Sequence, residues 1–281
     1  LLTCKASAAL ADGCAFIFID SIEPDGSLNP EVYQRMGRVL ARTQPYEPFL
    51  GGVPCQDVAI YLSTASKFDP ADNGKPVDSR ELSGRQPHVD SAVNVARALS
   101  EHHLPYGVIT RRNLTELARW PVVVLPNVLQ MDDEEAEAVR AYVRGGGCIY
   151  ASGYSSLIDA HGQRRADFAL SDLFGASVTG ETTEGFTYIA PAPEYAALFP
   201  EYTELHPLGL PMRQLRLQAH ADAQVLGTLV LPYTDPADPV HFVSAHNNPP
   251  GVWTGAPEIV QHRFGQGQAI YCAGDLLFSQ A

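Results

Sequence analysis

The sequence lacks an excess of positive charge and any long apolar run. Lysine and arginine together number 19, against 32 aspartate and glutamate residues, which gives a formal net charge of −13 and an isoelectric point of about 5.0. Such a surface repels the phosphates of nucleic acids and of anionic lipids, so we expect no nucleic-acid partner and no membrane partner. No apolar stretch approaches the roughly 20 residues that a membrane-spanning helix needs.

The chain also lacks the cysteine spacing of a metal site. Its five cysteines form no C-x-x-C pair, and their number is odd: Cys4, Cys14, Cys55, Cys148 and Cys272. The last two lie in apolar runs, where a free cysteine behaves as a small buried hydrophobic residue. We therefore expect no zinc, no other metal and no cofactor. The compartment stays open on this basis, with a reducing one such as the cytoplasm favoured.

What the sequence does contain is a strand–helix–strand pattern from Trp120 to Asp159. Residues 122–125 (VVVL) are an unbroken apolar run, typical of a strand buried on both faces of a parallel sheet. Asp132 and Glu135 have the spacing of a capping box, and three glycines at 145–147 end the helix, the first of them suited to a left-handed cap. Residues 148–151 form the next strand, so the segment predicts a right-handed βαβ unit.

Further strands are predicted on both sides of this unit. Runs at 58–62 and 106–109 precede it, together with a helix over 89–99 and a polar stretch over 64–87 that is long for a compact domain. From about residue 176 the pattern changes to short β runs cut by prolines, which indicates an antiparallel section. The fold class predicted is α/β, with a doubly wound parallel sheet and an antiparallel β-rich insertion at about 176–257.

The first 54 residues form a segment of their own. Residues 5–10 end a helix, residues 15–19 (AFIFI) read as a buried strand that stops at Asp20, and Pro30 begins a second helix. One strand cannot form a sheet alone, so this strand should join the later sheet or pair with a strand outside the chain. Prolines and glycines then make a linker. The predicted domains are residues 1–54 and residues 55–281.

Six segments together resemble a known family. In chain order they are VAIYLS (58–63), LPYGVIT (104–110), VVVLPNV (122–128), RGGGCIYASGYSSLID (144–159), RRADFALSDLFGA (164–176) and GQGQAIYCAGDL (265–276). They resemble the class I glutamine-amidotransferase-like domain of glycoside hydrolases, called the β-galactosidase trimerisation domain. The resemblance implies a flavodoxin-like sheet. It also implies that residues 1–54 are the last βα unit of the hydrolase's (β/α)8 barrel, a partial TIM-barrel unit.

The same resemblance implies a function and its partners. A domain of this kind is a non-catalytic accessory part that assembles a β-galactosidase-like hydrolase. The implied partners are other copies of the chain, as a homo-oligomer and for this family a trimer, and the carbohydrate substrate of the parent protein. Two alternatives remain: a carbohydrate- or small-ligand-binding module, and a free-standing hydrolase that uses an unrecognised site.

The nucleophile of the amidotransferases has no equivalent here. In that superfamily it is a cysteine in a Cys-x-Gly turn, and the matching residues are Ala151, Ser152 and Gly153. Alanine cannot attack a carbonyl group, and His262 is followed by arginine and phenylalanine instead of completing a His-x-Glu pair. The paired carboxylates of glycosidases lie on earlier barrel strands, which this sequence does not contain. No catalytic residue is therefore predicted.

Ligand-binding candidates follow from the ends of predicted strands. Ser152, Tyr154, Ser155 and Asp159 come just after the second strand of the βαβ unit, where doubly wound folds place ligands. Asp20 ends the predicted barrel strand, where barrel active sites form, and could line a sugar pocket. The simpler alternative is that Asp20 caps the turn that follows it.

Overall fold

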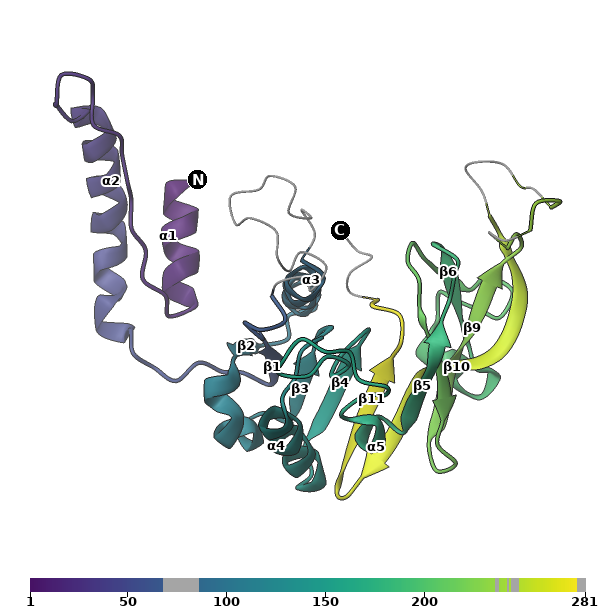
Figure 1. Cartoon of the computed structure of the whole chain (residues 1–281). Helices are drawn as coiled ribbons and strands as arrows, with labels where there is room; N and C mark the ends of the chain where they lie inside the picture. Colours follow the sequence, from purple (N-terminus) through teal and green to yellow (C-terminus); the bar gives the residue numbers. More distant parts are fainter. Residues whose placement is uncertain (68–85, 236–237, 242, 244–247, 277–281) are drawn as a thin grey trace. The chain divides into compact units, whose positions relative to one another are not determined.

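The computed structural model describes residues 1–67, 86–235, 238–241, 243 and 248–276 of the chain (Figure 1). These residues divide into two units, Leu1–Cys55 and Gln56–Ala281. None of the helices within the described ranges is long and apolar enough to cross a bilayer. Most of the predicted polar stretch over 64–87 lies outside the described residues.

The first unit is helical. It contains α1 (Leu2–Ala11), α2 (Pro30–Thr43) and the 3-10 helix η1 (Gln44–Phe49). The predicted start of α2 is confirmed: the side chain of Asn29 caps it by accepting hydrogen bonds from the main-chain N–H groups of Glu31 and Val32, at 3.1 and 3.4 Å. Proline fits the first position of a helix because its missing N–H would have no partner there.

The strand predicted over residues 15–19 does not form within this unit, and its pairing with a strand outside the chain stays a prediction. Residues 14–23 form no regular structure, and the side chains of Ile17 and Ile19 are 83% and 88% exposed. A strand needs a neighbour that satisfies its main-chain N–H and C=O groups. The described part of this unit offers only helices and turns, so the apolar run has no pairing partner there and forms no strand.

The second unit is built on a mixed sheet, which confirms the α/β class. Its nine strands have the order β2-β1-β3-β4-β11-β10-β9-β6-β7 (Figure 1). The first five are parallel and the others join antiparallel. Their bounds are β1 Val58–Tyr61, β2 Tyr106–Ile109, β3 Val122–Leu125, β4 Cys148–Ser152, β6 Thr187–Pro191, β7 Leu208–Leu210, β9 Gln224–Pro232, β10 Pro250–Phe264 and β11 Gly267–Cys272.

Within the residues that the structure describes, this unit also contains a second sheet and several helices. The second sheet pairs β5 (Ala176–Glu181) with β8 (Leu215–Ala219) in antiparallel fashion. The helices are α3 (Pro87–Glu101), η3 (Arg111–Arg119), α4 (Asp133–Arg144), α5 (Ser171–Phe174) and η4 (Pro193–Leu198). The antiparallel section that the prolines predicted is confirmed in type and position.

Helices cover both faces of the parallel part of the sheet. On one face, Ile60 and Val124 pack with Ala92 and Val95 of α3. On the other face, Val123 belongs to the largest core cluster, which also holds the buried residues of α4. Successive residues of a strand point to opposite faces, so a strand that is apolar at every position suits a sheet covered on both sides.

The helix α4 begins and ends as predicted, but a different glycine makes the left-handed turn after it. Asp132 accepts a hydrogen bond from the N–H of Glu135 at 2.8 Å, and Glu135 accepts one from the N–H of Asp132 at 3.0 Å, which completes the capping box. The predicted left-handed cap at Gly145 is wrong, because its φ is −81°. Gly146, with φ of 110°, makes the turn one residue later, after Gly145 has extended the helical hydrogen bonds. Glycine adopts such a φ without steric cost.

Candidate functional site

A pocket of about 570 Å³ lies at the carboxyl ends of three parallel strands. Residues at or after the ends of β1, β2 and β3 line it, together with Ala160, which comes after β4: Tyr61, Leu62, Ser63, Thr64, Ala65, Thr110, Arg111, Arg112, Gln130, Asp132, Glu135 and Ala160. Because β2 and β3 lie on opposite sides of β1, the chain leaves β1 and β3 in different directions. Open parallel sheets bind their ligands at such a point, beyond the carboxyl ends of the strands.

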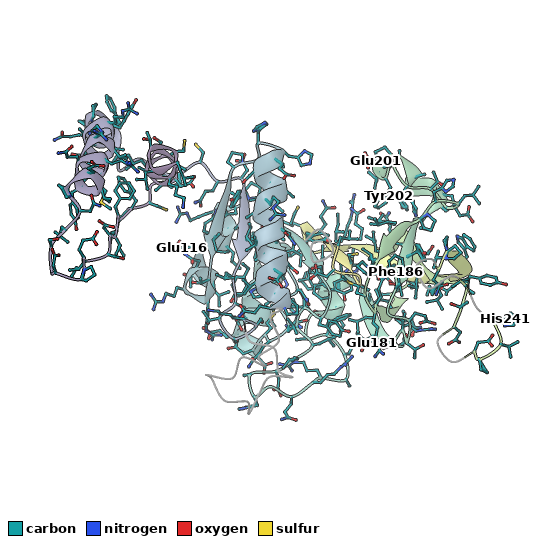
Figure 2. The ribbon with its side chains drawn as sticks, turned by 90° about the horizontal axis from the view of Figure 1, so that it is seen from above. Glu116, Glu181, Phe186, Glu201, Tyr202 and His241 are labelled. Atoms are coloured by element: carbon teal, nitrogen blue, oxygen red, sulfur yellow. The ribbon has the colours of Figure 1, made fainter. Side chains whose placement is uncertain are left out.

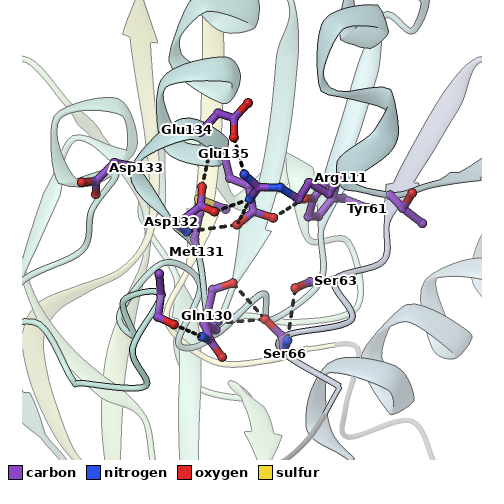
Figure 3. A network of polar contacts seen from close by, with 12 residues as sticks. Tyr61, Ser63, Ser66, Arg111, Gln130, Met131, Asp132, Asp133, Glu134 and Glu135 are labelled. Carbon is purple, nitrogen blue, oxygen red and sulfur yellow. Dashed lines mark hydrogen bonds and ion pairs between the residues drawn. The ribbon is translucent and has the colours of Figure 1, made fainter.

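Arg111 is the centre of the polar contacts in this pocket (Figure 3). Its guanidinium contacts the carboxylates of Asp132 and Glu134, and lies 3.4 Å from Oε2 of Glu135. Thr110 caps η3 directly after β2, which places Arg111 opposite the first turn of α4. The three carboxylates are also favoured there by the positive end of the helix dipole.

Tyr61 contacts one of these carboxylates, that of Glu135, from the end of β1. It is the last residue of β1, is buried, and donates a hydrogen bond from its hydroxyl to Oε1 of Glu135. Burial, together with this hydrogen bond, raises the pKa of the Tyr61 hydroxyl well above its usual range, so it stays a neutral donor. Glu135 is thereby held by three groups: Tyr61, Arg111 and the main chain of Asp132.

The opposite wall is fixed by hydrogen bonds between loops. Ser66 Oγ donates to the carbonyl of Gln130 at 3.1 Å and accepts from its N–H at 2.9 Å. His88 is buried and bridges two strand ends: Nε2 lies 2.9 Å from the N–H of Ser63, and Nδ1 lies 2.7 Å from the carbonyl of Pro126. Burial lowers the pKa of His88, so the ring is neutral, with Nδ1 as donor and Nε2 as acceptor. Both ring nitrogens of His88 are therefore engaged in hydrogen bonds to the main chain.

Arg112 differs from Arg111 in the pairing of its guanidinium. Its main-chain N–H donates to Oγ1 of Thr110 at 3.4 Å, and the residue is exposed and lines the pocket. Within the described ranges, its guanidinium has no ion-pair or hydrogen-bond partner. It is therefore available to a ligand. The same part of the chain contains no group of three or more His, Cys, Asp or Glu side chains placed to hold a metal ion.

Two of the predicted ligand-binding residues are internal. Ser152 and Ser155 are both fully buried. Ser152 Oγ donates to Asp275 at 3.1 Å and accepts from the N–H of Asn127 at 3.1 Å. Ser155 Oγ accepts from the N–H of Val128 at 2.9 Å. These hydroxyls join the loops that follow β3 and β4, and neither of them lines the pocket.

The other predicted residues of this unit lie closer to the surface. Tyr154 donates from its hydroxyl to Glu181 at 2.5 Å. Asp159 accepts hydrogen bonds from the N–H groups of His161 and Gln163 at 2.8 and 2.9 Å, and these bonds lower its pKa. Asp159 therefore closes a turn. Neither residue lines the pocket, although Ala160, next in the chain, does.

Asp20 belongs to the first unit, whereas the other four predicted residues belong to the second. It is half-buried, and among the described residues its Oδ2 atom has no hydrogen-bond partner. The turn that follows is closed by Asp25, which accepts from the N–H of Ser27 at 2.9 Å. The binding role given to Asp20 stays a prediction, as do the roles given to the other four residues.

Ala151 lies inside β4 and is fully buried. It pairs in register with Leu125 on one side and Tyr271 on the other. Two residues in the turn directly after β4 have a left-handed backbone. Gly153, with φ of 58°, has no side chain, and Ser156, with φ of 65°, is fully buried, with its Oγ accepting from the N–H of Leu170 at 3.3 Å. A nucleophile in a strand-to-helix turn needs an exposed side chain at the strained residue. Ala151 and Gly153 have no nucleophilic atom, and the hydroxyl of Ser156 is buried.

The pocket residues were missed by the reading of the sequence. Tyr61, Arg111 and Glu135 come from three separate segments, and each one alone resembles an ordinary strand-end or helix-start residue. Two signals could have found them. The parallel strands were predicted correctly, and the residues after parallel strands meet at one edge of the sheet. The capping box at Asp132 and Glu135 also marked one wall.

Comparisons with known proteins agree with this architecture. The sequence profile of the β-galactosidase trimerisation domain matches residues 56–279. A search of curated proteins finds no match. Among solved structures, the α-L-fucosidase isoenzyme 2 of Paenibacillus thiaminolyticus is similar over 99% of this chain and 38% of its own, with 20% identity and a TM-score of 0.71.

Two β-galactosidases are similar as well. The enzyme of Bacillus circulans sp. alkalophilus matches 92% of this chain and 35% of its own, with 17% identity and a TM-score of 0.65. The enzyme of Rahnella sp. R3 matches 90% of this chain and 33% of its own, with 16% identity and a TM-score of 0.63. The chain thus spans little more than a third of the length of these structures, and the likeness is one of fold. The profile covers most of the sequence, and the chain belongs to the family of β-galactosidase trimerisation domains.

Proposed function

We propose that this chain is a non-catalytic accessory part of a β-galactosidase-like glycoside hydrolase, and that it assembles the enzyme. The family to which it belongs supports this role, and so do the names of the similar structures, which are glycoside hydrolases. One observation supports the absence of catalysis in this proposal. The position that matches the amidotransferase nucleophile holds Ala151, buried in the core, and the hydroxyl of Ser152 is committed to Asp275 and Asn127.

The finer description of the fold is part of the same proposal. The order β2-β1-β3-β4-β11, with all five strands parallel, supports a flavodoxin-like doubly wound sheet. For the first unit we propose the last βα part of a (β/α)8 barrel. The match to the fucosidase over 99% of the chain extends into this unit, which supports the assignment. The pattern of side-chain exposure at residues 16–19 also supports the assignment, because half-buried Phe16 and Phe18 alternate with exposed Ile17 and Ile19 as in a strand.

The proposed partners are other copies of the chain, as a trimer, and the carbohydrate substrate of the parent enzyme. The word trimerisation in the family description supports the first. All five cysteines are free, and three of them are exposed: Cys4, Cys14 and Cys55. Exposed thiols persist in a reducing compartment, which supports a place in the cytoplasm.

The chain is expected to turn over neither glutamine nor aryl glycosides. The physical reason is that Ala151 has no nucleophilic atom and that Ser152 Oγ is buried and doubly hydrogen-bonded. Purified chain would be incubated with each substrate and product release measured, with the β-galactosidase of Bacillus circulans sp. alkalophilus as positive control for glycoside hydrolysis. Turnover that is lost in a Ser152→Ala variant of unchanged circular dichroism would refute the proposal.

The chain is also expected to associate with itself at micromolar concentration. The first unit exposes Ile17, Ile19 and Ile22, at 83%, 88% and 70%, and a cluster of apolar side chains of this kind marks an interaction surface. Sedimentation velocity should show a species larger than the monomer. The double variant Ile17→Asp with Ile19→Asp should weaken the association by about tenfold or more, because a buried isoleucine contributes roughly 1.5–3 kcal/mol.

The matched control for this variant is Leu205→Asp. Leu205 is 76% exposed but belongs to the second unit, so its replacement should leave the association unchanged. A chain that sediments as a monomer over the whole micromolar range would remove the support for assembly. If the two variants weakened the association equally, the contact would not be made specifically by Ile17 and Ile19 of the first unit.

A further inference from the structure

We propose that the pocket at the carboxyl ends of β1, β2 and β3 binds a neutral, polyhydroxylated molecule of the size of a mono- or disaccharide. This inference rests on the carbohydrate partner named in the proposed function and assigns to it a site within this chain, which assembly of the enzyme does not itself require. The place of the pocket supports binding, since it lies where the loops after β1 and β3 separate. Its volume of about 570 Å³ lies within the range of small-molecule sites.

The charges around the pocket disfavour an ion as ligand. Arg111 and Arg112 contribute two positive charges, whereas Asp132, Glu134 and Glu135 contribute three negative ones. An anion would gain little from this balance, and the whole chain carries a net charge of −13. A cation would have to compete with Arg111, which already occupies the three carboxylates. A neutral ligand meets neither obstacle.

The groups that remain available suit hydroxyl groups. Arg112 has five N–H donors without a partner in the described chain, and the side chain of Asp132 is 28% exposed and can accept a further hydrogen bond. Thr64 adds an exposed hydroxyl, which both donates and accepts. The neighbouring hydroxyls of a sugar also donate and accept hydrogen bonds, so they can pair with these groups. Leu62 and Ala65 supply apolar contact for the C–H groups of a ring.

The supporting contacts make this a preformed site. Glu135 is held by Tyr61 and Arg111, and Gln130 is held by Ser66, so the walls are fixed before a ligand arrives (Figure 3). Sites with fixed polar groups lose less conformational entropy on binding. The two exposed residues, Thr64 and Arg112, can be changed without disturbing these contacts.

The test is a calorimetric titration of the whole chain with galactose, with lactose and with inorganic phosphate. We expect saturable binding of at least one sugar and none of phosphate. Arg112→Ala should weaken sugar binding by about tenfold or more, because it removes a charged hydrogen-bond donor. Thr64→Trp should abolish binding by filling the pocket. Arg97→Ala is the matched control: it removes an exposed arginine of α3 that does not line the pocket and should leave binding unchanged.

Three results would overturn the proposal. These are the absence of saturable binding by either sugar, binding of phosphate that is lost in Arg112→Ala, and sugar binding that both pocket variants leave intact. Thermal melting of each variant shows whether it is folded. The result is separate from that of the assembly experiment. A chain that associates but binds no sugar refutes only the pocket, and a monomeric chain that binds sugar refutes only the assembly.

Discussion

Replacing Glu258 by glutamine is expected to stabilise the protein by an amount that grows as the pH rises. Glu258 lies in β10 and is fully buried. In the described part of the chain, neither of its carboxyl oxygens has a hydrogen-bond partner of good geometry. Burial raises the pKa of this carboxyl well above its usual range, and the main-chain N–H of Gly274 offsets only part of the rise.

The sign of the effect follows from proton binding. The folded state keeps the proton of Glu258 at pH values where the unfolded state, with a pKa of about 4.3, has lost it. The free energy of unfolding therefore falls as the pH rises above the unfolded pKa, by up to about 1.4 kcal/mol per pH unit, until the folded pKa is reached. Below the unfolded pKa the two states bind the same proton, and the glutamine variant has no such pH dependence.

The measurement is chemical denaturation of wild-type protein and variant at several pH values between about 5 and 8. The difference in unfolding free energy should widen steadily with pH. The matched control is Glu201→Gln, which removes an exposed carboxylate (Figure 2) and should follow the wild-type curve. Parallel curves for wild-type protein and the Glu258→Gln variant would contradict the prediction.

The second large effect is expected from Glu135→Ala in the pocket wall, at about 3 kcal/mol of unfolding free energy. Tyr61 is 1% exposed, and the change removes the acceptor of its hydroxyl, which would be left without that partner. It also removes half of the capping box of α4, because Glu135 accepts from the N–H of Asp132 at 3.0 Å. Denaturation in urea would measure the loss.

A double-mutant cycle separates these contributions. Tyr61→Phe alone should cost about 1 kcal/mol, since Glu135 keeps its other two contacts. The double variant should cost less than the sum of the single variants, because the buried hydroxyl and its acceptor are removed together. Glu134→Ala, with a side chain 76% exposed, is the control and should change stability by no more than about 0.5 kcal/mol. Strict additivity would show that the two residues do not interact.

The sequence by itself determined the elements whose causes are local. The run at 122–125 is a strand because it is apolar at every position, and α4 begins after Asp132 because the capping box satisfies the first main-chain N–H groups. The left-handed glycine after α4 was misplaced by one residue, since Gly145, Gly146 and Gly147 are equivalent in the sequence. Their hydrogen bonds to α4 select Gly146 for the left-handed turn.

Only the tertiary structure decided which residues meet. The apolar run at 15–19 has the composition of a strand, but a strand exists only where another strand pairs with it. Ser152 and Ser155 follow a strand in the sequence, yet hydrogen bonds to neighbouring loops hold them in the interior. Tyr61, Arg111 and Glu135 form one site because parallel strands bring their carboxyl ends to a single edge of the sheet, however far apart their residues lie in the chain.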